Sequence, residues 1–253
     1  MRYARKMART DFNTPRLCVD DDLAEGGCVT LTPEAAHYLV NVLRLASGAR
    51  VLGFNGRDGE WAARLDTQNR KRLALLLEEQ TRPQEFPPDV EYLFAPLKHA
   101  RLDYMAQKAV EMGARSLKPV ITRRTQAARL NLERLQANAR EACEQCGVIW
   151  LPEVAEPASL EDALRTHPPE RLLAFCDEEA PLASPLAALA AAPAAKGVTL
   201  LIGPEGGFDE SERTTILKVP LLLRLNLGPR ILRADTAAVA GLALLQACFG
   251  DWR

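Results

Sequence analysis

The sequence has little from which a metal site or a disulfide framework could be built. It holds three histidines and six cysteines, and only Cys143 and Cys146 are closely spaced. A second CxxC pair is lacking and no histidine lies near the first, so the usual spacing of a zinc site is missing. Cys143 and Cys146 fall in a helical pattern, where positions i and i+3 share one face and usually pack. We predict no metal, and reduced thiols as in a cytosolic protein.

Excess charge and long apolar runs are lacking too. The formal net charge is −1, and neither the part before Pro87 nor the part after it is basic overall. Any contact with nucleic acid would therefore depend on local basic patches. The longest apolar runs are interrupted by Pro, Lys or Gly and fall short of a membrane span. The basic first residues are not followed by an apolar stretch, unlike a secretory signal. We predict a cytoplasmic protein that does not contact a membrane.

Three sequence regions are expected. Residues 1–13 are basic and without periodicity, which is typical either of a flexible arm or of a nucleic-acid contact. Residues 14–83 predict a small β-rich domain containing one helix, for which Thr32 is a suitable N-cap and Pro33 a suitable first residue. Three prolines between Thr81 and Asp89 mark a linker. The predicted strands of the β-rich domain are 17–19, 28–31, 50–55, 60–65 and 73–78.

Residues 84–253 alternate between strand and helix patterns. The strands 172–176, 198–202 and 222–227 are apolar throughout, which favours a parallel sheet covered on both faces. The other predicted strands are 90–95, 117–121 and 148–151, and the predicted helices are 99–112, 130–146, 159–163, 209–217 and 235–249. The chain is therefore predicted to be α/β, with a β-rich domain in front.

Two loops stand out because each follows a buried strand and precedes a helix. They read LIGPEGGF at 201–208 and LNLGPRILRADT at 225–236. Ligands of α/β sheets bind beyond the carboxyl ends of the strands, and glycine lets a backbone approach a ligand closely. Each loop alone is more typical of an ordinary turn, with Glu205 as a helix cap and Arg233 in a surface ion pair. Two such loops together indicate a ligand site.

Several familiar ligand motifs are missing. The sequence has no GxGxxG after the first strand of a βαβ unit, no GxxxxGK[ST] and no GxSxG. Binding of a dinucleotide, phosphate transfer from a nucleoside triphosphate and a hydrolase nucleophile elbow are therefore disfavoured.

The segments LIGPEGGFDESE and LNLGPRILRADTA resemble the motifs of the ribosomal RNA small subunit methyltransferase E family, which belongs to the knotted SPOUT methyltransferases. The family pattern ends LGPRILRTETA, so Ala234 and Asp235 replace Thr and Glu. Weaker similarity covers nearly the whole chain, including 15–19, 37–45, 107–113 and 141–147, although Val148 stands where the family usually has Arg.

The resemblance implies a C-terminal SPOUT α/β domain with a trefoil knot, preceded by a small β-barrel PUA-like domain that binds RNA. It also implies a homodimer that uses S-adenosylmethionine to methylate N3 of a uridine in 16S rRNA, within the assembled small ribosomal subunit. Two alternatives stay open at this point. One is a SPOUT methyltransferase that acts on another rRNA or tRNA position, and the other is a non-catalytic RNA-binding relative.

Site residues follow from the same two loops. By resemblance, the adenosyl pocket would be lined by Leu201, Gly203, Glu205, Gly206, Leu225, Leu227, Gly228, Ile231, Leu232 and Thr236. Arg233 is the candidate for stabilising negative charge on the uracil, because a guanidinium stays protonated and donates paired hydrogen bonds. Asp235 is either a proton acceptor or a helix cap. The candidate phosphate partners, each equally typical of solvated surface charge, are Arg16, Arg44, Arg123 and Arg124.

Overall fold

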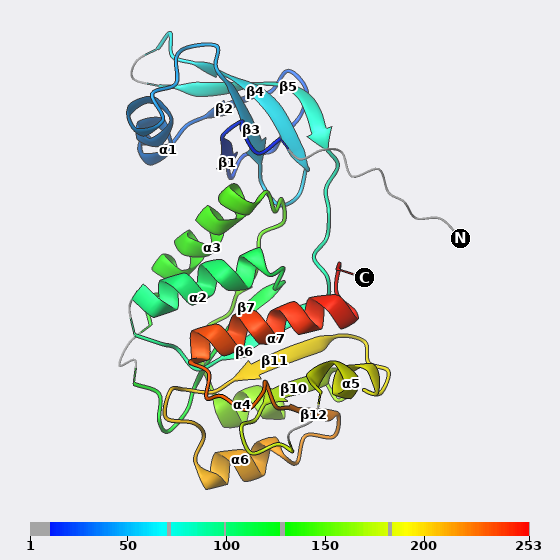
Figure 1. The fold of residues 1–253 in the computed structure, drawn as a ribbon. Helices are drawn as coiled ribbons and strands as arrows, with labels where there is room; N and C mark the ends of the chain where they lie inside the picture. Colours follow the sequence, from blue (N-terminus) through cyan, green and yellow to red (C-terminus); the bar gives the residue numbers. More distant parts are fainter. Residues whose placement is uncertain (1–10, 70–71, 99, 127–129, 182–183, 253) are drawn as a thin grey trace, which may run out of the picture. The chain divides into compact units, whose positions relative to one another are not determined.

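The computed structural model describes residues 11–69, 72–98, 100–126, 130–181 and 184–252. These residues form two compact units (Figure 1). The N-terminal unit extends to Phe86 and includes Cys143–Leu151, and the C-terminal unit comprises Pro87–Ala142 and the chain from Pro152 onward. Most of the predicted basic arm at 1–13 lies outside the described residues. Within the described ranges, every helix is too short or too polar to cross a membrane.

The N-terminal unit is built on a five-stranded sheet with the order β1-β3-β4-β5-β2. Its strands are β1 (Arg16–Cys18), β2 (Cys28–Thr30), β3 (Arg50–Phe54), β4 (Glu60–Asp66) and β5 (Ala74–Arg82). β1 pairs with β3 in parallel, and the other pairs are antiparallel. The expected closed barrel is not confirmed. Among the described strands, β1 and β2 stand at opposite edges without pairing, so the sheet is a half-barrel.

The helix predicted after Thr32 is present, but it changes from α-helix to π-helix along its length. Thr32 is the N-cap of α1 (Pro33–His37), and its hydroxyl accepts a hydrogen bond from the Ala35 amide at 3.2 Å. The chain continues as a π-helical turn, η1 (Tyr38–Val42). Leu39 in this turn is fully buried in the core of the unit, where it joins Val51, Leu65 and Leu75. The apolar spacing predicted the buried face of this segment but not the wider turn.

The C-terminal unit has a seven-stranded sheet with the order β12-β10-β11-β6-β7-β8, in which β9 also pairs with β7. All of its strand pairs are parallel, as the unbroken apolar strands predict. The strands are β6 (Val90–Phe94), β7 (Ser116–Ile121), β8 (Glu153–Val154), β9 (Ala158–Ser159), β10 (Leu172–Cys176), β11 (Val198–Ile202) and β12 (Leu222–Leu225). The strand predicted at 148–151 is wrong, because those residues are a loop and the short strands β8 and β9 follow it.

Helices cover both faces of this sheet (Figure 1). The helices are α2 (Ala100–Glu111), α3 (Leu132–Cys146), α4 (Leu160–Arg165), α5 (Pro185–Ala190), α6 (Glu210–Ile216) and α7 (Ala234–Phe249). α7 packs on β6 and β11 and is itself covered by α2 and α5. On the other face, Leu160 of α4 and Ile216 of α6 pack with Leu173, Phe175 and Leu201 in one core.

The strand order decides where the two glycine-containing loops lie. β11 and β12 are both hydrogen-bonded in parallel to β10, one on each side. Their carboxyl ends therefore lie at the same edge of the sheet. The bends at Gly203 and Gly228 therefore lie at one edge of the sheet, on either side of strand β10.

Candidate functional site

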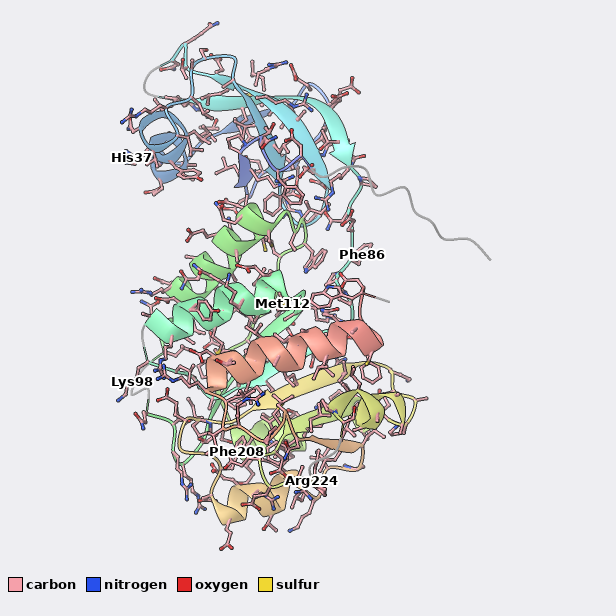
Figure 2. All side chains as sticks on the ribbon, in the orientation of Figure 1. His37, Phe86, Lys98, Met112, Phe208 and Arg224 are labelled. Carbon is pink, nitrogen blue, oxygen red and sulfur yellow. The ribbon has the colours of Figure 1, made fainter. Side chains whose placement is uncertain are left out.

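The loop after β11 is shaped by its own side chains. A Cβ atom on Gly203 would stand 2.6 Å from Cε2 of Phe208, whose ring also packs edge-on against Phe175. Gly207 has φ of +70°, a conformation that favours glycine. Asp209 then caps α6 in a reciprocal capping box with Glu212. Gly203 is thus needed to make room for Phe208 (labelled in Figure 2), which differs from the expected approach of a ligand.

The loop after β12 is held in place by Asn226. The side chain of Asn226 donates to the Ala180 carbonyl at 2.9 Å and accepts from the Gly228 amide at 2.9 Å. Gly228 has φ of +109°, so a glycine is needed at this turn. The chain then runs past Arg230 to Arg233, the N-cap residue that precedes α7. A buried amide side chain therefore sets the path of this second bend.

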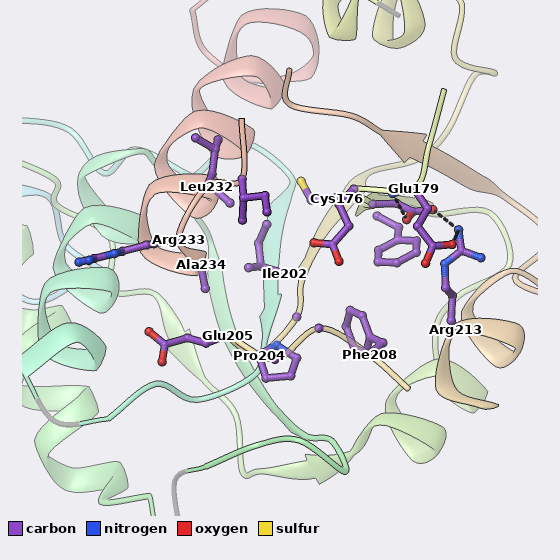
Figure 3. A pocket seen from close by; sticks show the side chains of 18 of the residues that line it. Cys176, Glu179, Ile202, Pro204, Glu205, Phe208, Arg213, Leu232, Arg233 and Ala234 are labelled. Atoms are coloured by element: carbon purple, nitrogen blue, oxygen red, sulfur yellow. Dashed lines mark hydrogen bonds and ion pairs between the residues drawn. The ribbon is translucent and has the colours of Figure 1, made fainter. Parts of the chain in front are cut away.

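Two adjoining cavities of about 430 and 350 Å³ lie where these loops meet. Both are in the range of small-molecule sites, roughly 300–1,000 Å³. The two cavities have part of their walls in common, formed by Cys176, Asp177, Glu178, Glu179, Ile231, Leu232 and Ala237. Figure 3 shows the larger cavity, with Ile202, Pro204 and Phe208 on its strand side and Leu232 from the second loop.

Most of the predicted cofactor residues line these cavities. Gly203, Glu205 and Gly206 line the larger one, Leu225, Leu227 and Gly228 the smaller one, and Ile231 and Leu232 both. Ile231 is 93% exposed, so its side chain is accessible to a ligand in either cavity. Leu201 is instead buried in the sheet core, and Thr236 is exposed but lines neither cavity.

A third loop was missed by the sequence analysis. Asp177, Glu178 and Glu179 follow β10, the strand between β11 and β12, and line both cavities. The available signal was an acidic triplet directly after a buried apolar strand. Arg101 of α2 and Arg213 of α6 also line the larger cavity, and Arg101 forms an ion pair with Glu205. Nothing in the local sequence marked these two arginines.

Arg233 and Asp235 occupy different environments at the start of α7. Arg233 is the N-cap residue, is exposed and lines the larger cavity. Figure 3 shows it on the same side of that cavity as Glu205 and away from Arg213. Asp235 lies in the first turn, where its carboxylate accepts from the Thr236 amide at 2.8 Å. The alternative that Asp235 is the helix cap is wrong, because Arg233 is the N-cap and the helix begins at Ala234.

Two groups beside the cavities are kept neutral by burial. Burial raises the pKa of the Cys176 thiol to about 12, and the charge of Asp177 adds to the shift. Burial also raises the pKa of Tyr92 well above its ordinary value, helped by Cys176 and Asp235. The Tyr92 hydroxyl donates to the Met105 sulfur at 2.9 Å. Both side chains therefore stay protonated, Tyr92 fully buried in the sheet core and Cys176 partly exposed in the walls of both cavities.

The four predicted phosphate partners are placed differently. Arg16 is buried, and its guanidinium donates to Glu60 at 2.9 Å and to the Asp11 carbonyl at 2.6 Å, so it has no free face for a phosphate. Arg44 is exposed in the N-terminal unit. In the C-terminal unit, Arg123 forms an ion pair with Asp209 at 2.9 Å, and Arg124 donates to the Gly206 carbonyl at 2.7 Å. The structure thus places Arg124 against the loop that lines the larger cavity.

Comparison with known proteins matches both units. Residues 84–246 match the RNA methyltransferase domain family, and residues 31–78 match the RNA methyltransferase PUA domain. The chain is 33% identical to a ribosomal RNA small subunit methyltransferase E from Synechocystis sp., covering 92% of this chain and 77% of that protein. It is 28% identical to the protein of that name from Rickettsia conorii, covering 91% and 94%.

A solved structure shares the fold over nearly the full length. The ribosomal RNA small subunit methyltransferase E from Neisseria gonorrhoeae, bound to S-adenosyl methionine, is 29% identical with a TM-score of 0.81. The similarity covers 95% of this chain and 100% of that one. Sequence, domain matches and fold agree. The chain belongs to the ribosomal RNA small subunit methyltransferase E family, with a PUA-like domain and an RNA methyltransferase domain.

Proposed function

We propose that this protein uses S-adenosylmethionine to methylate N3 of a uridine in 16S rRNA. One observation carries the proposal: the bends at Gly203 and Gly228 border adjoining cavities, and the exposed Arg233 lines the larger of them. The related proteins from Neisseria gonorrhoeae and Legionella pneumophila were crystallised with this cofactor, which supports the same ligand here.

The cavity walls fit such a cofactor. Ile231 and Leu232 offer apolar surface for an adenine ring, while the loop backbones of Gly203, Gly206 and Gly228 offer amide and carbonyl groups. Glu205, Leu225 and Leu227 complete the proposed binding set, to which Leu201 and Thr236 contribute only from outside the walls. When bound, the cofactor supplies an electrophilic methyl group on a sulfonium.

The chain's own residues must deal with a proton and a charge. N3 of uracil carries a hydrogen at neutral pH, and its loss leaves negative charge shared by N3, O2 and O4. Within the described chain, the guanidinium of Arg233 has no ion-pair or hydrogen-bond partner, so its donors are available to those oxygens. Asp235, two residues further along α7, is the proposed proton acceptor.

We assign the RNA contacts to both domains, 14–83 and 84–253. Arg44, Arg123 and Arg124 are exposed and suit phosphate oxygens, and the engaged Arg16 is left out. The proposed substrate is the assembled small subunit, and the proposed working form is a cytoplasmic homodimer. An exposed apolar residue such as Ile231 at the cavity rim suits a site that a partner or RNA covers.

We also propose that the C-terminal segment forms the trefoil knot of the SPOUT fold. From the edge strand β12 the chain passes the cavities beside β10 and β11 and then packs as α7 on β6 and β11. A trefoil knot requires in addition that this segment thread through a loop of the same chain, which ordinary connections do not do. An experimentally determined chain trace, closed at its ends and tested for a knot, checks this topology.

Transfer of a labelled methyl group tests the function. Small subunits purified from a strain that lacks the modification are incubated with the protein and S-[methyl-³H]adenosylmethionine. Transfer should occur and should block reverse transcription at one uridine, because a methyl group on N3 occupies the base-pairing edge. The protein-free reaction and subunits that are already methylated are the controls.

Each alternative gives a different result. Methylation of transfer RNA, or a labelled base that does not stop reverse transcription, would contradict the proposed substrate or position. Cofactor binding without methylation of any ribosomal RNA would favour a non-catalytic RNA-binding protein. Failure to bind the cofactor would contradict the proposal as a whole.

A further inference from the structure

The acidic loop after β10 presents one carboxylate that the protein leaves uncompensated. Asp177 and Glu179 are both engaged by arginine: Asp177 Oδ2 accepts from Arg213 at 2.9 Å and from Arg224 at 2.6 Å, and Glu179 lies 3.2 Å from Arg213. The carboxylate of Glu178, between them, has neither an ion pair nor a hydrogen bond within the described chain.

Glu178 faces the cavity and not bulk solvent alone. It lines both cavities, and its Oε1 lies 3.7 Å from the position that a Cβ on Gly207 would occupy. Its carboxylate thus reaches from the β10 loop towards the glycine loop after β11. Glu178 is exposed, so solvent screens its charge in part, but its carboxylate is near enough to act on whatever the cavity holds.

The backbone on both sides of Glu178 is fixed. The Asp177 side chain is 2% exposed, and its Oδ1 accepts from the Glu179 amide at 3.0 Å. The Asp177 amide donates to the Leu225 carbonyl at 2.9 Å, which ties the loop to the end of β12. Asp177 is therefore a positioning residue that holds Glu178 in the cavity wall. These contacts fix the backbone of the loop, from which the exposed Glu178 side chain extends at the cavity wall.

Glu178 gives the cavity wall one carboxylate that no cation of the described chain pairs with. The smaller cavity is lined by three carboxylates and by one arginine, Arg230, and Glu178 is the carboxylate without a protein partner. In the proposed reaction the donor carries a positive sulfonium, whereas the product S-adenosylhomocysteine has an uncharged thioether in its place. The two ligands otherwise differ by one methyl group.

We infer that Glu178 makes the cavity discriminate between the cationic donor and its uncharged product. This inference rests on the proposed function and names a specificity-determining residue within it. The unpaired carboxylate attracts the sulfonium, and the attraction ends when the methyl group and its positive charge have left. Glu178 thereby favours exchange of product for fresh donor.

Three ligands separate the effect of charge from that of shape. S-adenosylmethionine has a sulfonium, sinefungin has an ammonium at the same place, and S-adenosylhomocysteine is neutral there. Isothermal titration should show that E178Q lowers the affinity for the two cationic ligands about three- to tenfold. Affinity for S-adenosylhomocysteine should stay within twofold. E178D keeps the charge and should keep the preference.

Glu210 provides the matched control. It is exposed, lies in the same unit at the start of α6 and lines neither cavity. E210Q removes the same charge and should leave all three affinities unchanged. Raising the salt concentration should reduce the preference of the wild type for the cationic ligands, because Glu178 is exposed and salt screens its charge.

The outcomes are distinct. An equal loss of affinity for all three ligands in E178Q would overturn the inference. It would mean that Glu178 contacts a part that the ligands share, or that the variant has a structural defect. Unchanged affinities in E178Q would overturn it too. If the wild type binds all three ligands and E178Q keeps its preference, only this inference fails. A wild type that binds none contradicts the proposed function as well.

Discussion

The ring of Phe208 lies directly over Gly203, so that a methyl group on Gly203 would stand 2.6 Å from the ring. The glycine therefore serves the packing of its own loop. Phe208 in turn contacts Phe175 of β10 with ring centroids 5.5 Å apart, which links the glycine loop to the neighbouring strand. This small contact decides how the wall of the larger cavity is shaped, and it leads to the first prediction.

Gly203→Ala should displace Phe208 and destabilise the protein by about 1–3 kcal/mol, the usual cost of overpacking a core. Cofactor affinity should fall with it. Gly206→Ala is the matched control for stability, because its Cβ would meet Arg124 Cδ at an ordinary 3.5 Å. Urea unfolding and isothermal titration measure both effects. Equal stability of the two variants would show that Phe208 moves aside freely.

Arg233→Ala should lower kcat on the order of a hundredfold, as expected for a lost donor to an oxyanion, while cofactor affinity changes little. Arg233 lines the larger cavity but contributes no capping hydrogen bond to α7, so folding should be unaffected. Lys218→Ala, an exposed cation outside both cavities, is the control. A normal turnover rate would remove Arg233 from the mechanism.

Substitution of Arg16 should lower stability, whereas substitution of Arg44 should weaken RNA binding. Arg16 and Glu60 form an ion pair whose side chains are both 3% exposed, so Arg16→Ala should destabilise the protein by about 3–5 kcal/mol. Arg44→Gln should keep stability, weaken RNA binding and lower the salt dependence of binding by about one unit or less. Urea unfolding and RNA-binding titrations at several salt concentrations measure both. Weaker RNA binding by a fully stable Arg16→Ala would contradict the structural role.

Cys176 should resist alkylation in the folded protein. Its thiol pKa is raised to about 12 by burial, and the thiolate is the reactive form. The exposed Cys28 serves as an internal reference. At pH 8, iodoacetamide should label Cys28 first and Cys176 only after unfolding, as followed by peptide mass spectrometry. Rapid labelling of folded Cys176 would show that the thiol is accessible and ionised.

The same raised pKa implies a loss of stability at high pH. The folded protein keeps the Cys176 proton, whereas the unfolded chain releases it near the ordinary value of 9.0. The unfolded state is therefore favoured progressively as pH rises from about 9 towards 12. Urea unfolding between pH 8 and 10.5 should show this decline, and Cys176→Ala should make it shallower. An identical pH dependence in the variant would contradict the assignment.

Local sequence was sufficient for the features that depend on neighbouring residues. Thr32 and Ser159 begin helices as N-caps, and Asp209 closes a capping box, because each needs only a hydroxyl or carboxylate a few residues before its amide partner. The apolar strands β10, β11 and β12 predicted a parallel sheet for a similar reason. Short apolar runs were less certain, and the strand expected at 148–151 is a loop with Ile149 buried.

The tertiary structure decided which distant residues meet. The strand order β12-β10-β11 brings Asp177 to Arg213 and Arg224 and Phe208 to Gly203. It also leaves the Glu178 carboxylate without a partner among the residues that the structure describes. Burial of Arg16 likewise depends on Glu60, in a different strand. Backbone propensity and capping act over a few residues. Pairing of charges and packing of rings act through space, so only the fold determines them.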